Sequence, residues 1–311
     1  MLAIVPPSRR GYLYVVLAAL FWAVSGSSAK YLFHSGISPF QLVQIRLTIA
    51  AAALFIWLAV RNPSLLRIDT SDIRYFVLFG TLGPAAVQFT YLFAISKIHV
   101  AAAILLQYLA PSFIAIHAVV FFKDRLSRWT ILALIGSFAG CYLVVGAYNL
   151  DIVSMNLAGI ISGVLSGVTF AWYSIHGEYG MRRYNPWTVI CYALLVAALI
   201  WNILHPPLEG FQHAYRPAQW WWIVYISIMG TLVPFGLYLE GVNLIRSTRA
   251  SITATLEPIT AGLLSYLFLD EVMDPPQLLG AVLVIASIIL LQLKQEFDEK
   301  APALIRARKK G

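Results

Sequence analysis

A pattern of prolines, glycines and acidic residues occurs twice in the chain, 147 residues apart. Leu109-Ala110-Pro111 is followed thirteen residues after its proline by Asp124, and Leu256-Glu257-Pro258 is followed at the same distance by Glu271. The same shift superimposes further pairs of identical residues, namely Pro39 and Pro186, Gly83 and Gly230, Tyr91 and Tyr238, Ala103 and Ala250, and Phe121 and Phe268. A fixed period over so long a span is typical of a duplicated structural unit. We therefore predict two units, residues 1–150 and 151–293, followed by a basic tail at 294–311.

The composition is that of a membrane protein. Hydrophobic residues make up 60% of the chain and charged residues only 12%, and the mean hydropathy is +0.77. A soluble domain has roughly 45–50% apolar and about 25% charged residues. Ten segments approach the roughly 17–25 mostly apolar residues that a membrane-spanning helix needs. They are residues 11–33, 38–60, 73–95, 99–122, 129–148, 157–178, 186–204, 219–241, 250–270 and 275–293. The expected fold class is an all-α integral membrane protein, with ten transmembrane helices in two five-helix repeats.

Positive charges are distributed unequally between the predicted loops. One side carries eighteen Lys and Arg residues, including those of the tail, and the other side carries only Lys97 and Arg216. Because loops rich in Lys and Arg remain in the cytoplasm, both termini are expected there, with the protein in the cell (inner) membrane. Five helices per unit is an odd number, so the second unit should be inverted relative to the first. Inverted repeats that hold a site between them are typical of secondary transporters.

Gly36-x-x-Pro39, Arg46 and the segment from Leu256-Glu257-Pro258 to Leu269-Asp270-Glu271 stand out within the repeated pattern. Together they resemble the drug/metabolite transporter superfamily, and within it the ten-helix EamA-type carriers. Asp124 replaces the usual Glu in the first unit, and Ala193 occupies the position equivalent to Arg46. The resemblance implies a cavity between the first four helices of each unit, with the fifth helices peripheral. It also implies export of small metabolites by alternating access, with amino acids, including aromatic ones, as the best candidates.

Two ionisable residues, Arg46 and Glu257, lie well inside predicted helices. A charge at membrane depth costs at least about 2.5–3.5 kcal/mol, so each should face a cavity or a partner. For Arg46 the alternatives are an ion pair with Glu257 or Glu240, contact with the lipid interface, and contact with a substrate carboxylate. For Glu257 they are a proton site, an anchor for a substrate ammonium group, and a hydrogen bond to a backbone carbonyl that Pro258 leaves free.

Neutral polar and aromatic residues extend this candidate site. Gln88 and Tyr91 should share one helix face, and Trp172, Tyr173 and His176 should share another. Rings beside hydrogen-bonding groups suit an aromatic or amphipathic substrate, whereas interhelical hydrogen bonds are the structural alternative. The candidate substrate-binding residues are Trp22, Gln44, Arg46, Gln88, Tyr91, Gln107, Trp172, Tyr173, His176, Tyr238 and Glu257.

Glycines and prolines inside the predicted helices indicate where they bend. The candidate hinge residues are Gly83, Pro84, Pro111, Gly230, Pro234 and Pro258. Simple close packing is the alternative explanation for the glycines among them. Gly136-x-x-x-Gly140 places two small residues on one helix face, which favours close approach of a neighbouring helix.

Other functional classes lack their sequence motifs. The chain contains no Walker A sequence, no H-E-x-x-H and no G-x-S-x-G, which argues against ATP hydrolysis and against a membrane-embedded enzyme. No filter-like loop or ring of charges favours a channel. A multidrug or other metabolite carrier of the same fold is the main alternative. We expect no cofactor and no metal site, since Asp270, Glu271 and Asp274 lie together at a helix end where solvated acids are common.

The expected partners follow from where the charge is. The net charge of +8 lies in loops and in the tail, beside an apolar chain, so nucleic acid is excluded as a partner. A small-molecule substrate and the lipid bilayer remain, with a monomer as the working assumption for the assembly.

Overall fold

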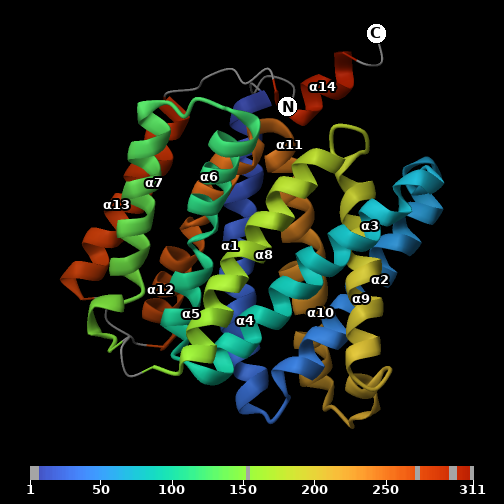
Figure 1. Cartoon of the computed structure of the whole chain (residues 1–311). Helices are drawn as coiled ribbons and strands as arrows, with labels where there is room; N and C mark the ends of the chain where they lie inside the picture. The colour runs from blue at the N-terminus through green and yellow to red at the C-terminus, as the bar shows by residue number, and fades with distance from the viewer. Residues whose placement is uncertain (1–6, 152–154, 270–273, 294–299, 309–311) are drawn as a thin grey trace.

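The computed structural model describes residues 7–151, 155–269, 274–293 and 300–308, and these residues are almost entirely helical (Figure 1). The α-helices are α1 (Pro7–His34), α2 (Pro39–Arg61), α3 (Ile73–Gly80), α4 (Ala86–Lys97), α5 (Val100–Gln107), α6 (Ala110–Phe122), α7 (Arg128–Val144), α8 (Leu157–Gly180), α9 (Pro186–Leu204), α10 (Pro217–Ser227), α11 (Val233–Ala254), α12 (Leu256–Leu269), α13 (Pro275–Leu293) and α14 (Pro302–Arg308). Two π-helical turns, η4 (Thr81–Ala85) and η7 (Ile228–Leu232), join α3 to α4 and α10 to α11. Short 3-10 turns lie at Pro63–Leu66, Thr70–Asp72, Ala147–Asn149 and Glu209–Gln212.

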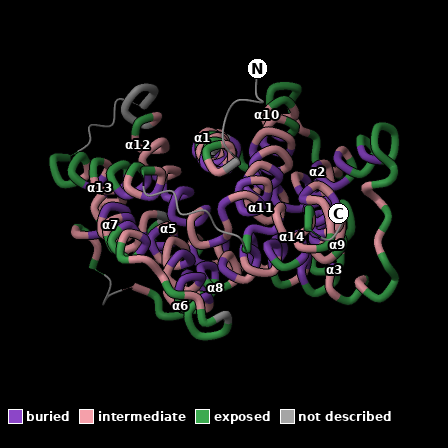
Figure 2. The backbone as a smooth tube through the Cα atoms, turned by 90° about the horizontal axis from the view of Figure 1, so that it is seen from above, coloured by how far each residue is buried: buried purple, intermediate pink, exposed green. Residues whose placement is uncertain are grey.

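The outer surface of this bundle is apolar. Seven helical segments in the described ranges are long and apolar enough to cross a membrane, namely Pro39–Arg61, Thr70–Lys97, Ala101–Phe121, Leu157–Gly180, Pro186–Leu204, Pro217–Ala254 and Pro275–Leu293. Figure 2 shows the buried residues along the middle of the bundle and the exposed ones at its periphery. Large apolar side chains are among the exposed ones, including Phe121 at 72% and Leu293 at 75%. A surface of this kind suits hydrocarbon. The chain is therefore an all-α, multi-pass membrane protein, as predicted.

Helix boundaries recur with the 147-residue period of the sequence. Starts of equivalent helices differ by this number in three pairs, α2 and α9, α4 and α11, and α7 and α13. The two π-turns are separated by the same number, since η4 begins at Thr81 and η7 at Ile228. Local sequence explains some of these starts. Pro39 and Pro186 both occupy the first turn of their helices, where the missing N–H is tolerated.

α11 is sharply bent at Arg246, whose backbone has φ 66° and ψ 165°. This region of backbone conformation is essentially restricted to glycine and costs on the order of 1–3 kcal/mol for another residue. His99, which lies 147 residues earlier, precedes α5 with ordinary extended angles of φ −58° and ψ 139°. The bend thus stands at the position equivalent to the α4–α5 boundary. It divides α11 into two arms, residues 233–245 and 247–254.

Two pairs of equivalent helices, α2 with α9 and α7 with α13, pack against each other and run antiparallel. In the α2–α9 pair, the ring of Phe40 lies 6.0 Å from that of Trp201, and at the other end the ring of Trp57 lies 6.3 Å from that of Trp187. The α7–α13 pair is closer still. A Cβ atom added at Gly140 would lie 2.7 Å from the carbonyl oxygen of Gly280, so only glycine allows the observed backbone approach.

The end of the bundle where α1 begins also holds the C-terminal tail. Figure 1 shows the N-terminus, α14 and the α6–α7 and α8–α9 connections at the same end of the molecule. Contacts support this arrangement, because Lys300 pairs with Asp124 of the α6–α7 connection and Arg306 donates to the carbonyl oxygen of Met181 after α8. We call this end the basic face. The predicted acidic pair Asp270-Glu271 lies outside the described residues, as does the first part of the tail.

Substituting Gly140 with Ala should destabilise the fold by about 1–3 kcal/mol, because backbone atoms of α13 surround the position and cannot move aside. Thermal unfolding of the purified protein in detergent should show a lower Tm for this variant. Ile135→Ala is the matched control on the same helix, since Ile135 is 61% exposed. An unchanged Tm for Gly140→Ala would mean that the two helices can separate without loss of stability.

Candidate functional site

Glu257 is held by a tyrosine from the other unit. It lies in the first turn of α12, and its Oε2 accepts a hydrogen bond of 2.8 Å from the hydroxyl of Tyr108. Tyr108 follows the last residue of α5. The same hydroxyl lies 3.3 Å from the carbonyl oxygen of Ala254. That carbonyl is four residues before Pro258, which has no N–H to donate to it. One hydroxyl therefore lies within reach of both the carboxylate and the carbonyl that the proline leaves free, and it donates its single proton to one of them at a time.

This geometry allows Glu257 to exist with or without a proton. When the carboxyl is ionised, Tyr108 donates to it. When the carboxyl is protonated, it donates to the tyrosine oxygen, and the tyrosine proton turns to the carbonyl of Ala254. In the protonated state the carboxyl, the tyrosine hydroxyl and the Ala254 carbonyl are all hydrogen-bonded, whereas in the ionised state the single tyrosine proton goes to the carboxylate and is not shared with the carbonyl. The arrangement can therefore hold a proton on Glu257 with each of these three groups hydrogen-bonded.

Arg46 and Tyr91 face the same region from the first unit. Tyr91, on α4, is within electrostatic range of both Arg46 and Glu257. The Nε atom of Arg46 is buried without a hydrogen-bond partner, and no described carboxylate pairs with its guanidinium. Of the alternatives for Arg46, the ion pair with Glu257 or Glu240 is thus not formed among the described residues. Arg46 and Glu257 are instead both within electrostatic range of one tyrosine, and the Nε–H of Arg46 is available to another group.

Trp22, Tyr173 and Tyr238 meet in an aromatic cluster at the contact between α1, α8 and α11. The Trp22 ring lies 5.6 Å from that of Tyr238, and the Tyr173 and Tyr238 rings are stacked 6.1 Å apart. Tyr173 and Tyr238 are fully buried. Ser174 donates to the carbonyl of Phe170, so the 2.7 Å contact between Ser174 and the Tyr238 hydroxyl has the tyrosine as donor. The cluster is a packed core, with its hydroxyls satisfied by protein.

A buried ion network closes the basic face. Glu178, near the end of α8, accepts hydrogen bonds from Arg246 Nε at 2.9 Å and from the backbone N–H and hydroxyl of Ser247 at 2.8 and 2.6 Å. Asp124 pairs with the other branch of Arg246 at 2.9 Å and also with Lys300. The sequence interpretation missed Glu178. The sequence does mark this residue, because Glu178 is a carboxylate at the end of an apolar run, three residues before Met181.

Asp124 lies outside the membrane-spanning helices, and two cations control its charge. Burial by itself raises the pKa of this carboxyl, but Lys300 and Arg246 outweigh burial and bring the pKa below its ordinary value. A depressed carboxyl pKa means that the ion pairs are complete above the ordinary pKa and are lost only as the pH falls through the depressed one. The network is therefore intact at neutral pH.

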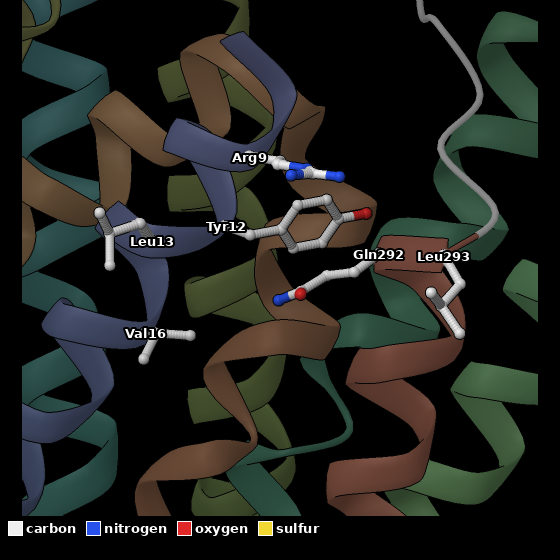
Figure 3. Close-up of a pocket in the computed structure, with 6 residues that line it drawn as sticks. All are labelled: Arg9, Tyr12, Leu13, Val16, Gln292 and Leu293. Atoms are coloured by element: carbon white, nitrogen blue, oxygen red, sulfur yellow. The ribbon is translucent and has the colours of Figure 1, made fainter. Parts of the chain in front are cut away.

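Two cavities open near the basic face, and neither is lined by a predicted substrate-binding residue. A gap of about 380 Å³ separates the start of α1 from the end of α13, and Figure 3 shows Tyr12 and Gln292 pointing toward each other across it. The Tyr12 hydroxyl donates to the carbonyl oxygen of Leu291 at 3.2 Å. A second cavity of about 230 Å³ is lined by Asp124, Arg246 and Lys300, among others. The ion network is thus reachable by water from this face.

Comparison with family models gives two matches along this chain. The model of the EamA-like transporter family matches residues 9–146 and again residues 157–293. The chain belongs to the EamA-like transporter family. It is therefore a secondary transporter of small metabolites and not an enzyme.

Relatives of this EamA-like transporter cover most of its length. It is 29% identical over 289 residues to the uncharacterized inner membrane transporter YicL of Salmonella typhimurium. This alignment covers 92% of this chain and 96% of the relative. It is 26% identical over 298 residues to the riboflavin transporter ImpX of Fusobacterium nucleatum, covering 90% and 96% of the two chains. A crystal structure with 19% identity aligns over 91% of this chain and 96% of the other with a TM-score of 0.74, which shows a shared fold.

Several predicted site residues of the transporter have other surroundings. Gln44 is fully buried, and its amide is engaged by Asn202, by the carbonyl of Pro206 and by the N–H of Gly210. Trp172 stacks on His176 at 3.5 Å between ring centres, away from Tyr173, which stacks on Phe79. The expected shared face of α8 therefore holds for Trp172 and His176 only, because consecutive helical residues point about 100° apart.

Gln88 and Gln107 stay close to the polar site of the EamA-like transporter. Gln88 is buried on α4, one turn before Tyr91. Gln107 ends α5, directly before Tyr108. Both belong to the first unit, on elements that already supply a member of the Glu257 site. They remain candidates for contact with a substrate.

The candidate hinge residues coincide with interruptions of the helices. Gly83 has non-helical backbone angles inside η4, and a Cβ there would lie 3.3 Å from Tyr173. Gly230 lies in η7, and a Cβ there would lie 2.1 Å from Ser25 Oγ of α1. Pro84 and Pro234 follow these glycines. Pro111 and Pro258 lie in the first turns of α6 and α12, so they mark breaks between helices rather than bends within them.

Removing the Tyr238 hydroxyl should weaken the aromatic cluster without unfolding it. Tyr238→Phe should cost about 0.5–1.5 kcal/mol, the net contribution of one hydrogen bond, because Ser174 loses its donor. Thermal unfolding of Tyr238→Phe, Ser174→Ala and the double variant forms a complete cycle. Tyr225→Phe, which removes a hydroxyl at the other end of the second unit, serves as control. Additive effects in the cycle would contradict the contact.

Proposed function

We propose that this transporter exports amino acids, including aromatic ones, by alternating access across the inner membrane. The observation that carries the proposal is that Arg46 and Glu257, from opposite units, are both within electrostatic range of Tyr91. An amino acid carries one carboxylate, one ammonium group and a side chain. Arg46 would bind the carboxylate, Glu257 would bind the ammonium group, and the tyrosines and glutamines nearby would contact the side chain.

The architecture proposed for this function is two inverted five-helix repeats, residues 1–150 and 151–293. Together with three further elements, the seven long apolar segments make ten membrane spans. These are α1 with 28 residues, α7 with 17 residues, and α12 with the second arm of α11, which the bend at Arg246 separates from the first. The antiparallel packing of α2 on α9 and of α7 on α13 supports inversion, because a twofold axis in the membrane plane reverses equivalent helices.

Orientation follows from the charges. The basic face carries the start of α1, α14 and the Lys- and Arg-rich connections, so we place it in the cytoplasm. The hinges proposed for alternating access are Gly83 with Pro84 and Gly230 with Pro234. Each pair interrupts a helix that packs against the first helix of the opposite unit, so bending there moves one unit relative to the other. A monomer contains both units and suffices for this scheme.

Counterflow in proteoliposomes tests the substrate class. Vesicles preloaded with unlabelled amino acids should accumulate external labelled phenylalanine or leucine, and an excess of unlabelled substrate should abolish the accumulation. Riboflavin is the informative competitor, because the relative from Fusobacterium nucleatum is named as its transporter. Accumulation of riboflavin with none of any amino acid would replace the amino-acid proposal by an aromatic heterocycle as the substrate.

Glu257→Gln should reduce exchange to background, because the amide cannot balance a substrate ammonium group or carry a proton. Tyr108→Phe should reduce it by at least about tenfold, since one hydrogen bond to a charged group is lost. Glu209→Gln is the matched control, because it removes the same charge from a glutamate in a 3-10 turn. Glu209 pairs with His205, and this variant should transport normally. A Glu257→Gln variant with wild-type rate and wild-type pH dependence would remove Glu257 from the mechanism.

A further inference from the structure

Arg246 combines a strained backbone with ion pairs to two carboxylates. Its φ of 66° belongs to the region that glycine favours, yet its side chain is only 14% exposed and is held at both ends of the guanidinium. The contacts reach Glu178 of the second unit and Asp124 of the first. Strain of this kind persists only where the surroundings impose it. The two carboxylates therefore hold the backbone at the junction of the two α11 arms.

The strain is specific to the basic face. His99, at the equivalent position in the first unit, has ordinary backbone angles and is exposed. The repeat itself therefore does not require the Arg246 conformation. Arg246 also differs from a surface residue in its environment, because Glu178 has a side chain only 4% exposed and is hydrogen-bonded to Ser247, the first residue of the second arm.

The C-terminal tail crosses this network. Lys300 pairs with the same carboxylate of Asp124 that binds Arg246, and Arg306 of α14 donates to the carbonyl oxygen of Met181, three residues after Glu178. Arg306 is also within electrostatic range of Glu240 on the first arm of α11. The tail thus contacts each of the three elements that meet at Arg246. Asp124, Arg246 and Lys300 also line the cavity of about 230 Å³.

We propose that Arg246, Glu178 and Asp124 form a latch that holds the basic face of the transporter closed, and that the tail keeps the latch engaged through Lys300 and Arg306. The inference rests on the proposed alternating access. Opening this face separates Asp124 of the first unit from Arg246 of the second. When the Arg246 side chain is released from Asp124, its backbone can relax. The second arm of α11, which leads to Glu257, therefore moves as the basic face opens.

Opening of the latch can be measured by how fast a reagent labels a buried position next to it. Ala250 lies one turn beyond Arg246 and is fully buried. Ala250→Cys is introduced into the full chain with the two native cysteines, Cys141 and Cys191, replaced by alanine. In proteoliposomes, a charged methanethiosulfonate reagent is added to the basic face and the rate of labelling is followed. Size-exclusion profiles confirm that each variant is folded.

Asp124→Asn should raise the labelling rate by about fivefold, since it removes the ion pair between the units, and Lys300→Gln by about twofold, since it removes only an exposed partner. Arg125→Gln, in the same connection, is the matched control and should leave the rate unchanged. Arg246→Gly should label at least as fast as Asp124→Asn and remain folded, because glycine adopts the observed φ without strain.

Wild-type labelling rates in Asp124→Asn and Arg246→Gly would overturn the latch. Raised rates in these two variants with no change in Lys300→Gln and Arg306→Gln would overturn the role of the tail. Labelling needs no substrate, so the outcome is independent of the amino-acid proposal. A transporter that exchanges no amino acid but shows the expected labelling pattern would keep the latch and lose the proposed substrate.

Discussion

Hydrocarbon cannot hydrogen-bond to a peptide group, so every break in a membrane helix needs a partner from within the protein. This chain breaks its helices at equivalent places in both units and supplies the partners itself. The carbonyl of Ala254, left free by Pro258, lies within reach of the Tyr108 hydroxyl. The break at Arg246 is bridged by Glu178, which accepts from the N–H of the next residue. The interruptions that a carrier needs for movement are thus also the places where its polar side chains gather.

The same requirement explains why the candidate site joins the two units. Tyr108 belongs to the first unit and Glu257 to the second, and neither side chain is satisfied by its own helix. At the basic face, Asp124 and Arg246 repeat the arrangement with charged groups. A carboxylate from one unit is therefore paired with a donor from the other unit at two places, one within the bundle and one at its end. Movement of one unit relative to the other must change both contacts together.

Close helix packing limits which parts can move. Gly140 brings the backbone of α7 against that of α13, and no side chain lies between them to yield. These helices form the side of the bundle away from α2 and α9 (Figure 2). The π-turns η4 and η7, in contrast, interrupt helices that contact α8 and α1. The rigid contact and the interrupted helices therefore lie in different parts of each unit.

The amino-acid sequence alone determined the membrane class, the 147-residue period and the positions of Glu257, Arg46 and the helix breaks. These properties are local, because apolar length, proline and glycine act on the segment that carries them. Only the tertiary structure decided which polar residues are already satisfied, as for Gln44, and which meet across the units, as for Tyr108 and Glu257. Glu178 and the strained Arg246 escaped the sequence interpretation, since residues 68 positions apart become partners only when α8 and α11 pack together.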